Sequence, residues 1–461
     1  MSARRDLVDR VSAAAVLALG VGLVAWAVRL VWFPEPSRLD VFGVWAEDGW
    51  SRNATAALAL ATGLASLGLA RVRGLRRLVA VGLLALSALG LAIAARALDV
   101  LALWSGVALA VVLAPLALAV ADERERAAAH ALNALLLGSL AAGVLGLGLA
   151  ALSALAGTTH LLEIGIFVER FEDAGPFALT ALRAAAVAVA LLAAWAPFHL
   201  GLPELWGEGS APLAAWLAAV WPWAGWTVLV RLAGGLAPAL AEWSMNGAAA
   251  VSLFLVLGAF VPGLAAVAEM RVGRLLALLA IGNLSELLLA VRAEGVAVPL
   301  VASGLWGVFL AQVVTAAALG GVRARLGGDG LETLRGLGVR HPARALALAI
   351  AAVLWIGLPG TFSLAVRWQL WQDRGASPLA VGVVVVGAFV RLLAAARLVR
   401  VLYLLPAPRS EEAVPPAIPR ALEIRWAAAF VLACLVELAL GLGPASWAAR
   451  LGAGAQAILG G

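Results

Sequence analysis

The sequence predicts an all-α polytopic membrane protein, and three observations support that fold class. The 461 residues are 64% hydrophobic and only 13% charged, and the mean hydropathy is +1.00. Apolar runs of about 18–25 residues recur along the whole chain, and each can cross the hydrocarbon core of a bilayer, which is about 30 Å thick. Arginines gather in alternate connections between these runs. A water-soluble core of this size would not need such a composition.

The apolar runs predict about 13 transmembrane helices. In chain order they cover residues 11–33, 54–71, 77–95, 100–120, 131–156, 177–197, 211–233, 247–268, 273–292, 297–318, 343–365, 379–404 and 424–446. The longest connections, near 34–53, 157–176, 319–342 and 405–423, have only about 20 residues each. None is long enough for a soluble domain, so we expect a single membrane domain over residues 1–461.

The charge distribution predicts the orientation of the chain and excludes one class of partner. The formal net charge is +6, but no basic domain or tail collects it, so we expect no nucleic-acid partner. Arginines precede the first run and fill the even-numbered connections, whereas odd-numbered connections such as "FPEPSRLDVFGVWAEDGWSRN" are acidic or sparse. The positive-inside rule then places the N-terminus in the cytoplasm and, after 13 crossings, the C-terminus outside.

Metal and disulfide chemistry have little support in the sequence. Cys434 is the single cysteine, which excludes an intramolecular disulfide, a cysteine-based zinc site and an iron–sulfur cluster. We expect no metal site and no cofactor in this chain.

Two of the predicted helices contain a proline inside or near the end of the apolar run. Pro197 lies in "LLAAWAPFHLGLPELWGEGSAP" and Pro359 in "WIGLPGTFS", five runs further on and therefore in a helix of opposite direction. Paired interrupted helices in two halves are typical of an inverted repeat with freed backbone groups facing a polar interior. The alternative is that both prolines reflect only the higher frequency of proline in membrane helices.

Four motifs, in order along the chain, resemble the antiporter-like proton-channel subunits of respiratory complex I, of the NADH-quinone oxidoreductase subunit N type. They are "APFHLGLPEL", "SAPLAAWLAAVWPWAGWTVLVRL", "GLAAVAEMRVGRLLALLAIGNLSELLLAV" and "LRGLGVRHPARALALAIAAVLWIGLPGTFSLAVRW". Related subunits occur in Mrp antiporters and membrane-bound hydrogenases. The resemblance covers roughly residues 100–405.

The resemblance implies an architecture, partners and a location. It implies two inverted five-helix repeats, each with a proline-broken helix, over residues 76–233 and 245–405, with N-terminal helices over 1–75 and a C-terminal helix over 424–446. It also implies other membrane subunits of a complex-I-like, hydrogenase-like or Mrp-like assembly as partners, the lipid bilayer as environment, and the bacterial cytoplasmic (inner) membrane as location. Redox chemistry in such assemblies belongs to partner subunits.

The residues that the resemblance implies for a proton relay are largely missing. Ala108 stands where the family has a glutamate, and Leu192 and Pro222 stand at its two lysine positions. Asn283 replaces a histidine, and Arg367 stands at the last lysine or glutamate position. All 33 basic residues are arginine, and the chain has no lysine. Because arginine keeps its proton at physiological pH, Arg367 cannot relay protons by titration.

A few polar residues remain inside predicted membrane helices. Glu286 lies one helical turn after Asn283 and so on the same face, and a carboxylate at that depth should be paired or protonated. It is either a relocated relay residue or one partner of a structural ion pair with Arg367 or Arg391. His199 is a candidate for proton transfer or merely caps the loop, and Glu437 in the last run is a second buried carboxylate candidate.

Two functions follow as hypotheses. The first is an antiporter-like membrane subunit of a complex-I-type NADH-quinone oxidoreductase or a related assembly, nominally for proton translocation, that serves as a scaffold because its relay is lost. The second is a stand-alone secondary ion or solute transporter with a new polar axis built from Glu286, Arg367 and Arg391. Whether such a chain belongs to an enzyme complex depends on its partners, since no catalytic redox site is predicted within it.

Overall fold

A computed structural model describes most of the chain. The described residues are 2–32, 38–39, 44–69, 72, 74–121, 125–170, 175–199, 201–208, 211–235, 237–292, 295–357, 361–372, 377–407, 427, 430–432 and 434–436. The predicted last span, 424–446, and Pro359 and Glu437 therefore lie wholly or largely outside the described residues.

The first half of the chain is built from long helices. In order, the elements are α1 (Ser2–Trp32), β1 (Arg38–Leu39), β2 (Ala46–Glu47), α2 (Gly49–Gly68), α3 (Gly74–Arg96), α4 (Val100–Ala121), α5 (Glu125–Ala156), α6 (Leu161–Arg170), α7 (Gly175–Leu192), α8 (Leu202–Glu208) and α9 (Ala211–Gly235).

The second half has a similar order of long helices. Its elements are α10 (Ala237–Ala268), α11 (Val272–Glu286), η3 (Leu287–Ala290), β3 (Val291–Arg292), β4 (Gly295–Val296), α12 (Val298–Leu326), α13 (Leu337–Arg340), α14 (Pro342–Ile356), α15 (Phe362–Gln372) and α16 (Pro378–Tyr403). In both halves three long helices precede an interrupted helix and one more long helix, in the sequence α3, α4, α5, α7/α8, α9 and α10, α11, α12, α14/α15, α16. This order agrees with two five-helix repeats, whose boundaries stay a prediction.

The predicted polytopic helical fold is confirmed. Eight of the described helices are long and apolar enough to cross a membrane, and two shorter apolar helices, Pro176–Leu192 and Pro342–Ile356, accompany them. The first 12 predicted spans all fall on helices. The exact number of crossings stays a prediction.

The structure has a helix interruption at each of the two predicted places. α7 ends at Leu192, five residues before Pro197, and residues 193–199 form turns with a cis peptide bond between Ala196 and Pro197. α14 ends at Ile356, where Gly357 has a φ of 79° that ends the helix in the left-handed region. α15 begins at Phe362 on the other side of this break.

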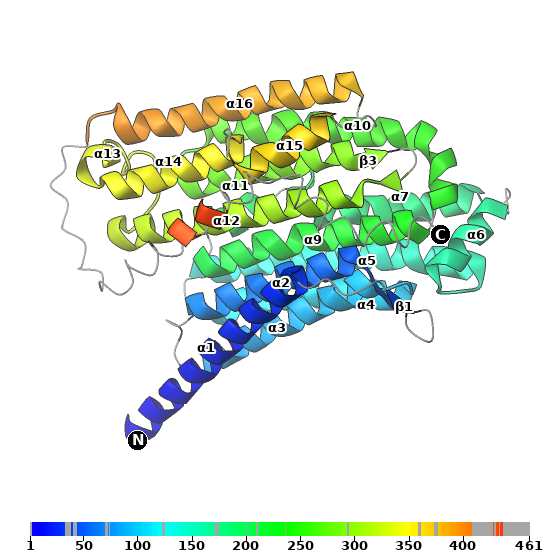
Figure 1. Ribbon diagram of the computed structural model, residues 1–461, viewed down its shortest axis with the longest axis horizontal. Coiled ribbons are helices and arrows are strands. Elements are labelled where there is room, and N and C mark those ends of the chain that lie inside the picture. Colours follow the sequence, from blue (N-terminus) through cyan, green and yellow to red (C-terminus); the bar gives the residue numbers. More distant parts are fainter. Residues whose placement is uncertain are drawn as a thin grey trace.

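The helices form one bundle, with α1 projecting from one edge and α16 lying along the opposite edge (Figure 1). α3 packs on α4, α5 on α7, and α10 on α11 and α16, while α9 packs on α12 where the two halves meet. Close packing depends on small residues: a Cβ built at Gly90 of α3 would lie 2.7 Å from the carbonyl oxygen of Gly106 of α4. Such close approach is the usual way in which membrane helices associate.

Several small elements were not expected from the sequence. Two antiparallel hairpins of two-residue strands, β1–β2 and β3–β4, lie in connections. The connections predicted near 157–176 and 319–342 contain the helices α6 and α13, and α12 continues to Leu326. Such short elements carry too few residues for a hydrophobic period to reveal them.

Candidate functional site

Three ionisable side chains meet in the second half. Glu286 is the last residue of α11, Arg367 lies on α15 and Arg391 on α16. The Nε of Arg367 lies 3.0 Å from Oε2 of Glu286, and Arg391 donates through Nη2 to Oε1 of the same carboxylate. The side chains of the glutamate and of Arg391 are 2% and 0% exposed. We call these three residues the Glu286 triad.

The interruption between α14 and α15 supplies further acceptors for the triad. Arg367 donates through Nη2 to the carbonyl of Trp355 over 2.6 Å and through Nη1 to the carbonyl of Ile356. Asn283 also donates to the Trp355 carbonyl, over 2.9 Å. These are carbonyls that the end of a helix leaves without an intrahelical partner. The guanidinium therefore fixes the broken helix end against α11.

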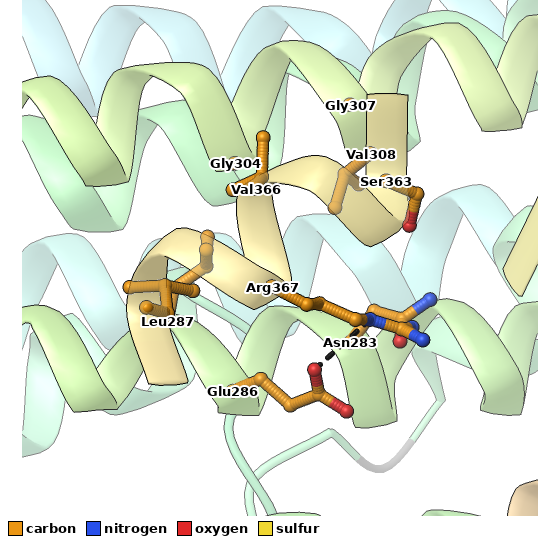
Figure 2. A pocket seen from close by; sticks show the side chains of 10 residues that line it. Asn283, Glu286, Leu287, Gly304, Gly307, Val308, Ser363, Val366 and Arg367 are labelled. Carbon is orange, nitrogen blue, oxygen red and sulfur yellow. Dashed lines mark ion pairs between the residues drawn. The ribbon is translucent and has the colours of Figure 1, made fainter. Parts of the chain in front are cut away.

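A small cavity lies beside the triad (Figure 2). Its polar lining comes from Asn283, Glu286, Ser363 and Arg367, and Figure 2 shows the side chains of Asn283, Glu286 and Arg367 converging on one another. Its volume of about 20 Å³ is room for about one water molecule. The Oδ1 of Asn283 has no hydrogen-bond donor among the described residues, so a water there would have an acceptor to bind.

The chemistry of the triad is that of fixed charge. Both arginines stay protonated at physiological pH, and their combined charge exceeds that of the single carboxylate by one unit. Within the described part of the chain no three His, Cys, Asp or Glu side chains gather as they would around a metal ion. The sequence offered two interpretations of Glu286, and the structure has the ion-pair geometry with both arginines; a relay role stays untested.

The lost relay positions lie in an apolar part of the first half. Leu192, at the end of α7, is completely buried, Pro222 is buried inside α9, and Ala108 is half-buried on α4. Large indole rings fill the neighbourhood, with the rings of Trp195 and Trp226 stacked edge to face at 5.5 Å. Tryptophan can donate but cannot accept or release a proton at physiological pH.

His199 is separate from the Glu286 triad. It lies in the break between α7 and α8, is buried, and its Nδ1 has no hydrogen-bond partner among the described residues. Its backbone carbonyl accepts from the amide of Leu202 at the start of α8, which fits the expected role in the loop without testing it.

One buried ion pair was missed by the sequence reasoning. Asp48 and Arg231 form a pair 2.6 Å long, with side chains only 6% and 5% exposed. Asp48 also caps α2 by accepting from the amide of Ser51. The aspartate three residues before a serine is an N-cap pattern that could have been recognised, but its partner lies 183 positions away.

A second cluster lies where α8 meets α11. Glu204 on α8 is 3.3 Å from Nη2 of Arg274 and 3.9 Å from Nδ1 of His130 on α5. The contact with His130 is too long to be a hydrogen bond. Glu204 is the acidic residue of the "APFHLGLPEL" motif, so the motif connects the two halves of the bundle.

Interrupted membrane helices around a buried polar centre are typical of ion-translocating membrane proteins, the class to which this fold points. Residues 97–392 match the family described as "NADH:quinone oxidoreductase/Mrp antiporter, TM". The chain belongs to this family, which confirms the resemblance predicted from the four motifs.

Individual proteins agree with the family. "NADH-quinone oxidoreductase subunit N 1" of Solidesulfovibrio magneticus is 30% identical over 326 residues, which are 68% of each chain. A chain of respiratory complex I from Thermus thermophilus superposes with a TM-score of 0.75 at 24% identity, covering 97% of this chain and 95% of that one. A chain of the Mrp complex from Dietzia sp. DQ12-45-1b has a TM-score of 0.76 at 18% identity, covering 98% and 93%. The last two likenesses establish the fold.

Proposed function

We propose that this multi-pass membrane protein is an antiporter-like subunit of a complex-I-type or related ion-translocating assembly, in which it acts as a scaffold without a proton path of its own. Membership of the family over residues 97–392 supports the place in an assembly. The partners are other membrane subunits, as in the complexes to which its structural neighbours belong. Cofactors and redox chemistry belong to those partners.

One observation carries the scaffold role: no titratable side chain occupies the family's relay positions in the first half. A relay works only through groups that gain and lose a proton. Ala108, Leu192 and Pro222 cannot do so, and two of them are buried among apolar and indole side chains. In the second half Arg367 and Arg391 keep their protons at physiological pH, so these two residues cannot pass protons along a relay.

The orientation is part of the proposal. Arginines in the even-numbered connections support a cytoplasmic N-terminus and an outward C-terminus in the bacterial inner membrane. Arg323, Arg335 and Arg344 lie near the ends of α12 and α14 on one such side. This orientation is tested with single cysteines introduced at Arg76 and at Leu101, in a variant in which Cys434 is replaced. The measurement is the side of the membrane from which each cysteine is accessible.

Mild-detergent purification of the chain from its native membranes, with mass spectrometry of the co-purifying proteins, tests the assembly. Recovery of homologous membrane subunits together with a redox arm is the expected result. Recovery of the chain alone, or only as a homo-oligomer, contradicts the proposal.

The Glu286 triad favours a second candidate, a stand-alone secondary transporter with a new polar axis. Buried ionisable residues in membrane helices commonly mark ion or substrate paths. Reconstitution of the purified chain into liposomes distinguishes the two functions, because the scaffold produces no proton flux. Flux that is present in the unmodified chain and vanishes in Glu286→Gln, at equal insertion, would establish a rewired path and refute the scaffold role.

A further inference from the structure

An exposed arginine lies on the outer face of a membrane helix. Arg183 is on α7, inside the apolar stretch Pro176–Leu192, and its side chain is exposed. No hydrogen bond or ion pair joins it to another of the residues that the structure describes. This sets it apart from Arg231, Arg367 and Arg391, which are buried against carboxylates or carbonyls.

The surroundings of Arg183 are apolar. Val187, four residues after Arg183, lies on the same helical face and is 39% exposed, and Phe177 on the adjacent side of α7 is 70% exposed. Thr180 lies between them, but its hydroxyl already donates to the carbonyl of Pro176. On the adjacent helix α5, Leu147 is 73% exposed. The arginine is therefore a single cation on a lipid-facing surface.

Packing contacts fix the depth of this cation. A Cβ built at Gly148 of α5 would lie 2.7 Å from the carbonyl oxygen of Ala181 and 3.1 Å from the amide of Ala185, so Arg183 lies level with Gly148. Gly146, half a turn away on α5, lies against the indole of Trp104. Trp104 is four residues after the first residue of α4. Arg183 lies in the middle of α7 (Gly175–Leu192), but these contacts place it near the level of the first turns of α4 and of Trp104. Tryptophan side chains concentrate where headgroups meet the acyl chains.

We infer that Arg183 binds the phosphate of a phospholipid headgroup, whose acyl chains lie along the exposed apolar face of α5 and α7. The guanidinium offers several donors in a planar fork that matches phosphate oxygens. The depth places it within reach of the headgroup layer, where a long side chain extends towards water. A phospholipid satisfies both the charge and the apolar face, whereas a soluble anion satisfies only the charge.

Native mass spectrometry of the purified full-length chain, titrated with dioleoyl phosphatidylglycerol, tests this site. Dioleoylglycerol, which has the same chains but no phosphate, is the comparison ligand. We expect one phosphatidylglycerol to bind in preference to dioleoylglycerol, and Arg183→Gln to weaken that binding about fivefold, the factor for one cation near an anionic lipid. Arg183→Lys should keep part of the preference.

Arg170→Gln is the matched control, because Arg170 is an exposed arginine on α6 outside the apolar helix. It should bind phosphatidylglycerol as the unmodified chain does. Equal binding by Arg183→Gln and the unmodified chain overturns the inference, as does equal loss in both variants. Saturable displacement of the lipid by inorganic phosphate would assign the site to a free anion. Loss of a co-purifying protein in Arg183→Gln would assign Arg183 to a contact with another subunit. Either result also overturns the inference of a lipid site.

Discussion

Glu286 at the end of α11 accepts a hydrogen bond from Arg391 of α16, 105 positions further along the chain, and both side chains are completely enclosed by protein. With Arg367 of α15 on the other carboxylate oxygen, one glutamate holds three helices of the second half together. Removing one partner of a buried ion pair leaves an uncompensated charge, which costs far more than the net stability of the pair.

Glu286→Gln should therefore destabilise the fold by about 3–5 kcal/mol. The measurement is the thermal unfolding midpoint of the detergent-solubilised protein, followed by intrinsic fluorescence. Glu47→Gln is the control, because Glu47 is 52% exposed and pairs with Arg96 over 3.4 Å; it should change stability by less than about 1 kcal/mol. Unaltered stability of Glu286→Gln would show that the triad has no structural role.

Gly282→Ala should be destabilising by about 1–3 kcal/mol. A Cβ at this position would lie 2.7 Å from Cδ and 3.0 Å from Nη1 of Arg391, so the guanidinium would have to leave its place beside Glu286. Gly82→Ala in α3 is the matched control, since no atom lies within 4 Å of its built Cβ. That substitution should be neutral or stabilising by up to about 1 kcal/mol through helix propensity. Similar midpoints for the two variants would contradict the prediction.

Asp48→Ala and Asp48→Asn should separate two roles of one residue. Asparagine can still cap α2 through its side-chain oxygen, whereas alanine loses the cap, worth about 1 kcal/mol. Both variants leave Arg231 without a buried counter-charge, so both should lose about 3–5 kcal/mol. Unfolding midpoints should therefore rank the unmodified chain first, then Asp48→Asn, then Asp48→Ala. An Asp48→Asn variant as stable as the unmodified chain would show that the ion pair contributes little.

Leu192→Lys should not restore a relay. Leu192 is completely buried, and an isolated lysine there either loses its proton or destabilises the surrounding apolar packing by several kcal/mol. Proton flux of reconstituted protein should stay absent, and the unfolding midpoint should fall. Leu192→Met, which conserves volume, should cost less than about 1.5 kcal/mol. Proton flux gained by Leu192→Lys alone would show that the rest of the path is intact.

The membrane helices could be predicted well from the sequence, whereas most ion pairs between residues far apart in the chain could not. The first 12 apolar runs all fall on helices, because burial in lipid requires a continuous apolar length. The carboxylate at Glu286 identified the centre of the site, since a charge inside a membrane helix is rare and needs a partner. Its partners were limited to two arginines, and both turned out to contact it.

Two other ion pairs could not be predicted from the sequence. Asp48 lies in a connection, where a carboxylate is ordinary, and its N-cap pattern predicts the start of a helix but no arginine partner. Its pairing with Arg231 arises only when α2 and α9 pack together. The contact between Glu204 and Arg274 likewise depends on how α8 meets α11. Such pairs are set by tertiary packing, which periodicity does not encode.

The hydrogen bonds from Arg367 to the carbonyls of Trp355 and Ile356 have a consequence for hydration. A helix broken inside a membrane leaves carbonyl oxygens without intrahelical partners, and these can anchor ordered water molecules. Here a side chain of the same polypeptide occupies those anchors permanently. The helix is still broken here, but these two carbonyls are no longer free to organise a chain of water molecules through the membrane.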